Sequence, residues 1–151
     1  MSIFKKKNTI LSPCDGEIVE LKNVKDELFS SGLLGYGFGI KPTQGEVFSP
    51  IDGVVTNAFD TGHAYSIEGD GIEVLVHIGI DTVELDGEGF SARVKQGDKI
   101  KRHSPLAYAD LELITKKGYD TTTVVVIPTE LKSPKLSLGN KKAGEIAIEY
   151  R

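Results

Sequence analysis

Two apolar runs flank a short glycine-rich turn in residues 63–78, whose sequence is HAYSIEGDGIEVLVHI. Glycine and aspartate at 69–71 favour a tight β-hairpin turn. The run at 64–68 contains aromatic and β-branched residues, and the run at 72–78 is almost entirely apolar. So little polar surface is typical of a strand covered on both faces. We therefore predict an antiparallel hairpin of strands 64–68 and 72–78.

The turn places two of the three histidines at the open end of this hairpin. In a symmetric register about Asp70, the numbers of opposite residues add to 140, and His63 faces His77. Opposite residues of antiparallel strands have Cβ atoms about 4.5–5.5 Å apart and point to one face of the sheet. A shift of one residue would send the rings to opposite faces. The symmetric register therefore predicts two facing imidazoles.

Two facing imidazoles can carry a phosphoryl group. Neutral imidazole is a nucleophile near neutral pH, and His77 lies on the rigid apolar strand, so we predict that it attacks phosphorus. Gly79 leaves room beside it. The second ring, His63, can donate a hydrogen bond to the phosphoryl oxygens, and the hydroxyl of Thr61 can hold its tautomer. The alternative for each histidine is a hydrogen-bonded residue of the core.

The rest of the chain indicates an all-β fold with few short helical turns. Turn signals separate short apolar runs that are rich in valine and isoleucine, and 17 glycines argue against a helix bundle. Helical turns are predicted at 24–29 and at 110–117, the latter ended by Gly118. Further strands are predicted at 16–21, 45–49, 53–58, 105–109, 122–127 and 145–149.

An internal repeat suggests two related halves. Residues 12–18 and 49–55 both have the pattern Ser-Pro-x-Asp-Gly-x-(Ile/Val), which is typical of a turn that leads into a strand. A looser pair joins residues 95–100 with 142–146. Two hairpin-rich halves wrapped into one antiparallel β-sandwich or barrel would explain both repeats.

Composition narrows the class of protein. A chain of 151 residues suits one domain, with a flexible tail at 1–8 and a single domain at 9–151. The net charge of −4 gives no support to a nucleic-acid partner. With one cysteine, no secretion signal and no long apolar span, we expect a cytoplasmic protein. The basic residues of the tail leave a weak contact with an anionic membrane surface as an alternative.

Other candidate sites are weaker. His103 lies in a basic turn and is predicted to be a surface residue, whereas Cys14 is predicted to be buried. The glycine-rich segment 35–39 is interpreted as a turn that leaves room for a partner. No His-x-His, Cys-x-x-Cys or nucleotide-binding motif occurs, so we expect neither a metal nor a cofactor.

Longer motifs surround the two histidines. HIGIDTVEL stands at 77–85, followed by GEGF at 87–90, and TGHAYSI stands at 61–67. GIKPT stands at 39–43 and SPIDG at 49–53. In these motifs the chain resembles the glucose-class enzyme IIA component of the bacterial phosphoenolpyruvate–sugar phosphotransferase system. The resemblance covers residues 10–150, and its most specific part is 77–90 together with 61–67.

The resemblance implies a β-sandwich built from a duplicated hybrid motif and a set of partners. Histidine phosphocarrier protein (HPr) would phosphorylate His77, with His63 and Thr61 in support, and a cysteine of a IIB domain would receive the group. The chain would act as a phosphotransferase component and a monomer. The partner surface implied comprises Tyr36, Phe38, Phe59, Leu75 and Asp81. Many members have an acidic residue in place of Tyr36, and some have phenylalanine in place of Leu75.

Two alternative functions remain at this stage. The first is a regulatory module of the same fold that binds transporters or sensors without transferring phosphate. The second is a zinc metallopeptidase of the lysostaphin type, which needs a His-x-x-x-Asp motif and a His-x-His motif, and we expect neither in this chain.

Overall fold

The computed structural model describes residues 8–151, and most of the regular structure is β-strand. The strands are β1 (Asn8–Leu11), β2 (Gly16–Glu20), β3 (Tyr36–Pro42), β4 (Glu46–Phe48), β5 (Gly53–Ala58), β6 (Ala64–Gly69), β7 (Ile72–His77), β8 (Phe90–Ala92), β9 (Lys99–Ile100), β10 (Pro105–Ala109), β11 (Thr123–Ile127), β12 (Lys135–Leu136), β13 (Gly139–Lys141) and β14 (Ile146–Tyr150). The helices are the 3-10 turns η1 (Leu21–Asn23) and η2 (Thr82–Leu85) and the α-helices α1 (Glu27–Ser30) and α2 (Leu111–Lys116).

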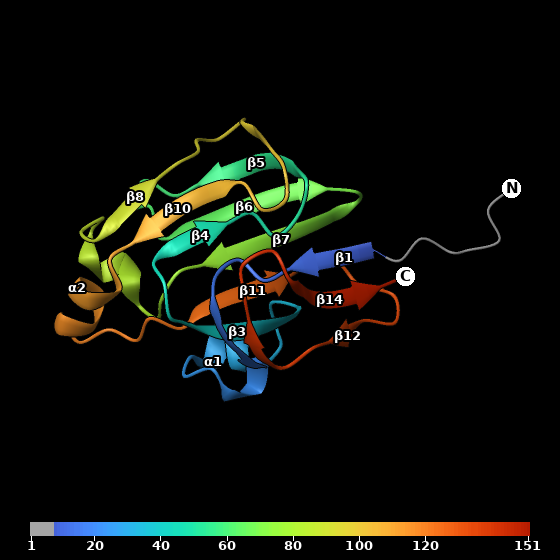
Figure 1. Cartoon of the computed structure of the whole chain (residues 1–151), viewed down its shortest axis with the longest axis horizontal. Coiled ribbons are helices and arrows are strands. Elements are labelled where there is room, and N and C mark those ends of the chain that lie inside the picture. The colour runs from blue at the N-terminus through green and yellow to red at the C-terminus, as the bar shows by residue number, and fades with distance from the viewer. Residues whose placement is uncertain (1–7) are drawn as a thin grey trace, which may run out of the picture.

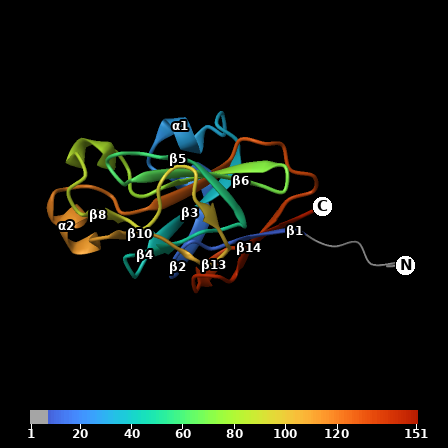
Figure 2. The same ribbon diagram turned by 90° about the horizontal axis from the view of Figure 1, so that it is seen from above.

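The strands form three antiparallel sheets that confirm the predicted fold class. The largest has eight strands in the order β13-β2-β3-β11-β7-β6-β5-β9, and two smaller sheets have the orders β1-β14-β12 and β4-β10-β8. Figures 1 and 2 show the small sheets packed against the large one, with α1 beside β3 and α2 at the end of the molecule away from the C-terminus. The result is a β-sandwich with short helices at its periphery.

The core lies between the sheets and includes one face of the central strands. Phe38 on β3, Val125 on β11 and Val76 on β7 are paired neighbours across the large sheet, and all three belong to this main cluster. A second, smaller cluster lies on the other face, where Val24 and Phe29 from the η1–α1 segment cover Val124 and Val126 of β11. Strand β11 is therefore buried on both faces along its whole length.

Strand β7 is covered less completely than its apolar sequence predicted. Its residues alternate between buried and half-buried, and Leu75 and His77 are half-buried on one face. The expectation of two covered faces is wrong for β7 because that face carries the histidine and is left partly open.

The glycine-rich segment 35–39 is also corrected by the structure. It is not a turn but the start of β3, between β2 and β11. A Cβ at Gly37 would lie 2.0 Å from the carbonyl oxygen of Val125, and one at Gly39 would lie 2.7 Å from Cγ2 of Val24. Glycine is needed here because the backbone of β11 and the side chain of Val24 approach the strand closely, and not because the chain turns.

All eight predicted strands are present, with ends that agree within about one residue. The six that sequence analysis missed are β3 and the short strands β1, β8, β9, β12 and β13. Helix α2 confirms the prediction at 110–117, and α1 falls partly within the turn predicted at 24–29. The predicted tail lies outside the described residues except for Asn8, which begins β1.

The Ser-Pro-x-Asp-Gly repeat has the same structure in its two copies. The hydroxyl of Ser12 donates to the carbonyl oxygen of Cys14 at 2.8 Å, and that of Ser49 donates to Ile51 at 2.7 Å. A Cβ on the glycine of either copy would lie 2.2 Å from a carbonyl oxygen of the neighbouring strand. The repeat therefore marks two equivalent turns.

The prediction that residues 95–100 and 142–146 are equivalent is only partly correct. Residues 95–98 and 142–145 do form the same kind of local turn, each closed by an acidic side chain. In the fold, however, residues 142–145 exchange backbone hydrogen bonds with Ser12 as residues 101–104 do with Ser49. The structural counterpart of 142–145 is therefore 101–104, because each of these segments bonds to the first serine of one copy of the Ser-Pro-x-Asp-Gly repeat.

We predict that Gly37→Ala destabilises the fold far more than Gly118→Ala. The Cβ at residue 37 collides with backbone, so we expect a loss of about 3 kcal/mol in the free energy of unfolding. The control position has a φ of 91° and open space around it, so only backbone strain of about 1 kcal/mol applies. Urea denaturation measures both values, and equal losses would contradict the close approach at β3.

Candidate active site

The turn between β6 and β7 corrects the predicted register. It contains two residues, Asp70 and Gly71, with φ of 51° and 80°, which is the conformation that aspartate and glycine favour in two-residue hairpins. Ala64 consequently pairs with His77, so that the numbers of opposite residues add to 141. The predicted register, which placed His63 opposite His77, is therefore wrong by one residue.

The two imidazoles meet nevertheless, because His63 lies outside the strand. Gly62 has a φ of 73° and turns the chain just before β6 begins at Ala64. The backbone N–H of Ile78 donates to the carbonyl oxygen of His63 at 2.7 Å, which holds this residue against the end of β7. The ring centroids of His63 and His77 are 5.0 Å apart, and the ring planes are inclined at 85°. The alternation of faces along a strand does not apply to a residue in this position.

A backbone carbonyl fixes the tautomer of His77. Nδ1 lies 2.8 Å from the carbonyl oxygen of Gly79, and because a carbonyl only accepts, Nδ1 of the neutral ring carries the proton and Nε2 has the lone pair. The loop is held in turn by Thr82, whose hydroxyl donates to the carbonyl oxygen of Ile78 at 2.5 Å. Gly79 has a φ of 82°, and a Cβ there would lie 2.4 Å from Cγ2 of Thr82.

Thr61 contacts the other ring at the corresponding nitrogen. Its hydroxyl oxygen lies 2.5 Å from Nδ1 of His63. A hydroxyl can donate to Nδ1, in which case Nε2 of His63 carries a proton. The turn itself is braced by Tyr65, whose hydroxyl donates to the carbonyl oxygen of Gly62 at 2.9 Å. Both histidines are therefore anchored through Nδ1, and Nε2 is the nitrogen left for chemistry.

Burial keeps both rings neutral. His63 is only 3% exposed, and desolvation, with a smaller effect of the neighbouring His77, lowers the pKa of His63 to about 4. Desolvation also lowers the pKa of His77, although its hydrogen bond to Gly79 and the carboxylates of Asp26 and Asp81 act in the opposite direction. Neutral imidazole is the nucleophilic form, so the site is ready to attack an electrophile near pH 7.

Aromatic rings surround the histidines. The ring of Phe59 lies 5.5 Å from that of His63, and Phe90 lies 6.4 Å from it. Phe29 lies 5.1 Å from the ring of His77 and is almost completely buried. Sequence reasoning identified Phe59 but missed the ring contacts of Phe29 and Phe90, since neither a short helix such as α1 nor a three-residue strand such as β8 carries a signal of which histidine its aromatic residue will contact.

The residues of the predicted partner surface differ in exposure and in the face they occupy. Phe59 is 41% exposed, Leu75 is half-buried on the same face as His77, and Asp81 is exposed just after β7. Phe38 is fully buried in the main core, so the prediction that it contacts a partner is wrong. Tyr36 is exposed, but it lies at the start of β3 with its side chain on the opposite face from His77.

The remaining polar candidates lie away from the site. His103 is exposed and its ring packs on Phe48, with centroids 5.0 Å apart. Cys14 is fully buried, and its pKa is raised to about 12 by desolvation. Both confirm what the sequence predicted of them.

Metal-binding geometry is limited. The expectation that no His-x-x-x-Asp motif occurs is wrong, because His77 and Asp81 have this spacing. Within residues 8–151, however, no group of three or more His, Cys, Asp or Glu side chains is placed to hold a metal ion. Among the same residues, no helix is long and apolar enough to span a bilayer.

Comparisons with known proteins identify relatives across the whole chain. The model of the family "phosphoenolpyruvate-dependent sugar phosphotransferase system, EIIA 1" matches residues 8–132. A glucose-specific EIIA component of Staphylococcus epidermidis is 41% identical over 135 residues, which cover 89% of this chain and 81% of that protein. Among solved structures, glucose permease IIA from Mycoplasma capricolum has a TM-score of 0.89 and 34% identity, and the match covers 99% of each chain.

Some relatives are much longer. A beta-glucoside-specific EIIBCA component of Bacillus subtilis is 50% identical over 119 residues, and that of Halalkalibacterium halodurans is 40% identical over 148 residues. These matches cover 78% and 95% of this chain but only 20% and 23% of the relatives. The chain thus spans about a fifth of the length of these two proteins.

The lowered pKa of His63 predicts a loss of stability in mild acid. The unfolded chain takes up a proton as the pH falls through about 6.5, whereas the folded chain does so only near 4. The free energy of unfolding should therefore decrease between these pH values, by about 1.4 kcal/mol per pH unit from this group, and the group has no effect above the window. Urea denaturation at several pH values of the native chain and of His63→Gln tests this, and identical slopes would contradict it.

Proposed function

The chain belongs to the EIIA 1 family of the phosphoenolpyruvate-dependent sugar phosphotransferase system, whose members carry a phosphoryl group from HPr toward a IIB domain, and we propose that His77 is the residue that carries it here. The observation that supports this most directly is the hydrogen bond from Nδ1 of His77 to the carbonyl oxygen of Gly79. It leaves the lone pair of Nε2 beside a second imidazole whose ring centroid is 5.0 Å away.

The proposed step is an in-line displacement at phosphorus. The lone pair of Nε2 of His77 forms the new N–P bond while the N–P bond to the histidine of phospho-HPr breaks, and the electron pair of that bond returns to the donor nitrogen. The proton stays on Nδ1 of His77 and remains hydrogen-bonded to the carbonyl oxygen of Gly79. This hydrogen bond stabilises the positive charge that develops on the ring. In the second step a IIB cysteine thiolate attacks the phosphorus, and His77 recovers its lone pair.

His63 is proposed to stabilise the phosphoryl group. With Thr61 donating to Nδ1, Nε2–H of His63 can donate to a phosphoryl oxygen, whose charge increases during transfer. A neutral donor serves both steps, because it stabilises the group without holding it as tightly as a cation would. The pKa of about 4 keeps the ring neutral before a phosphoryl group arrives.

The face around the histidines is proposed to dock both partners in turn. Phe59 and Leu75 supply apolar contact that excludes water from the reactive nitrogen. Asp81 supplies an exposed negative charge near His77, which suits a basic partner surface. One site that serves two partners in turn is consistent with a monomer. We propose that the transfer takes place in the cytoplasm, where a free cysteine such as Cys14 stays reduced.

The choice of sugar is proposed to lie outside this domain. Relatives named glucose-specific and beta-glucoside-specific match the chain at similar identity. The residues that contact the phosphoryl group contain no feature that would recognise a sugar, so specificity would come from the other components.

The role of His77 is tested by incubation with phosphoenolpyruvate, enzyme I and HPr, followed by mapping of the acid-labile phosphate. The native chain should be labelled at His77, and His77→Ala should take up no label. His63→Ala should still be labelled, but its transfer to a IIB domain should fall about a hundred-fold, because one hydrogen-bond donor to the transferred group is lost. Full labelling of His77→Ala would show that the nucleophile is misassigned, and a folded native chain that takes up no label would favour a purely regulatory role.

The role of Thr61 is tested by a matched pair of variants. Thr61→Val keeps the shape but removes the hydroxyl, which should slow onward transfer about five-fold, the equivalent of one neutral hydrogen bond worth about 1 kcal/mol. Thr61→Ser keeps the hydroxyl and should transfer at close to the native rate. Equal rates for the two variants would show that the hydroxyl does not set the tautomer of His63.

A further inference from the structure

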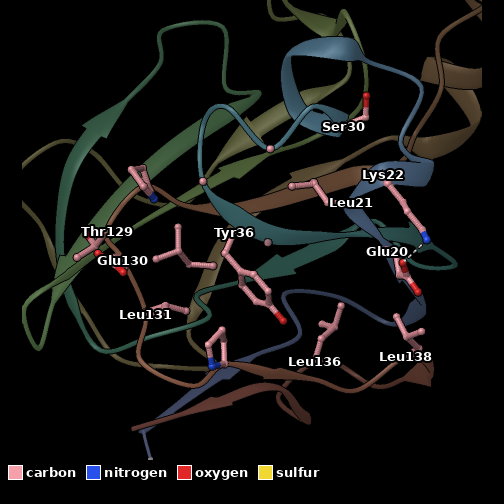
Figure 3. Close-up of a pocket in the computed structure, with 16 residues that line it drawn as sticks. Glu20, Leu21, Lys22, Ser30, Tyr36, Thr129, Glu130, Leu131, Leu136 and Leu138 are labelled. Atoms are coloured by element: carbon pink, nitrogen blue, oxygen red, sulfur yellow. Dashed lines mark ion pairs between the residues drawn. The ribbon is translucent and has the colours of Figure 1, made fainter.

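A second cleft lies away from the histidines, at the end of the sandwich where β3 begins. Its volume is about 790 Å³, which is within the range of ligand-binding clefts. Figure 3 shows Tyr36 in the middle of the cleft, with Leu131 and Leu136 on either side of it. Leu138 and Leu21 lie further out in the lining. These side chains come from β3, the loop after β11, the segment 135–138 and η1, so four separate parts of the fold meet here.

The apolar lining of the cleft is left open by the described residues. Leu138 is 49% exposed and Tyr36 is 37% exposed. A contiguous apolar surface of this kind, formed by residues far apart in sequence, is typical of a binding site. The histidine site does not use it, because Tyr36 lies on the opposite face of β3 from that site.

The charges at the margin favour a basic occupant. Glu20 is paired with Lys22 at 3.1 Å, as Figure 3 shows. Glu130, on the other side of the cleft, forms no ion pair within residues 8–151. The fitting occupant therefore combines large apolar side chains with adjacent positive charge.

The chain itself contains a segment of this chemistry immediately before β1. Residues 1–7, which lie outside the described residues, have the sequence MSIFKKK, with adjacent isoleucine and phenylalanine followed by three lysines. We propose that this segment docks in the cleft, with Ile3 and Phe4 against Leu136 and Leu138 and with the lysines near Glu130.

The topology brings the start of β1 within reach of the cleft. Asn8 pairs with Tyr150 on β14, and the other neighbour of β14 is β12, where Lys135 pairs with Glu149. Two strand spacings, or about 10 Å, therefore separate Asn8 from the edge of the cleft. Phe4 and Ile3 lie four and five residues before Asn8, and an extended chain of that length spans up to about 13 and 17 Å.

Docking would brace the segment that carries Phe29. Leu21 lines the cleft and also packs against the small cluster that contains Phe29. An occupant of the cleft would therefore contact the η1–α1 segment at Leu21. The same segment contacts His77 through Phe29. The proposal itself does not depend on the phosphoryl-transfer role.

A single indole tests the docking, because the chain has no tryptophan. In the full-length Phe4→Trp variant, we expect emission at shorter wavelength and weaker quenching by acrylamide than for N-acetyltryptophanamide. Adding Leu138→Lys, or Glu130→Lys, should restore the emission and quenching of an exposed indole. The matched control is Val54→Lys on β5, a residue of similar exposure (38%) outside the cleft, which should leave the indole protected.

Three results would overturn the proposal. The first is an indole that is already exposed in Phe4→Trp, including one that becomes protected only when anionic lipid vesicles are added. The second is protection that Leu138→Lys leaves unchanged while circular dichroism shows a native fold. The third is protection that increases with protein concentration, which would identify a second copy of the chain as the binding partner.

Discussion

The two-residue turn at Asp70 and Gly71 is the constraint on which the rest of the site depends. It sets a register that places Ala64, and not His63, opposite His77. The pleat alone would then send the rings to different faces. They meet because Gly62 takes His63 out of the strand and because Ile78 holds its carbonyl oxygen. A residue just beyond a strand can be directed at its neighbour, whereas the pleat decides the direction of residues within it.

Burial of the two histidines serves the chemistry at the expense of acid stability. Desolvation lowers the pKa of both rings, so that neither carries the proton that would block attack. The polar demands of the rings are met through Nδ1, by Gly79 for His77 and by Thr61 for His63. Each ring then has Nε2 available for a phosphoryl group. Anchoring by one nitrogen is what makes the other chemically distinct.

The sequence predicted the strands and the meeting of the two histidines better than the register that brings them together. Alternation and turn residues predicted eight strands, and the pairing of His63 with His77 followed from the hairpin. The register failed because a symmetric turn was assumed, and the contact survived only through the local conformation at Gly62. Phe29 was missed because no periodicity links a short helix to a distant strand. Phe38 was assigned to a partner surface because its strand was mistaken for a turn.

The glycines that concealed β3 from sequence analysis are themselves part of the site. With no side chain at Gly39, Val24 approaches the strand so closely that a Cβ would lie 2.7 Å from its Cγ2. Val24 brings the η1–α1 segment down onto the sheet, and that segment places the ring of Phe29 5.1 Å from His77. A larger residue at position 39 would lift this segment and uncover His77, the proposed nucleophile. The low β-propensity of glycine is therefore outweighed by close packing, and β3 is a strand because its neighbours on both sides pair with it.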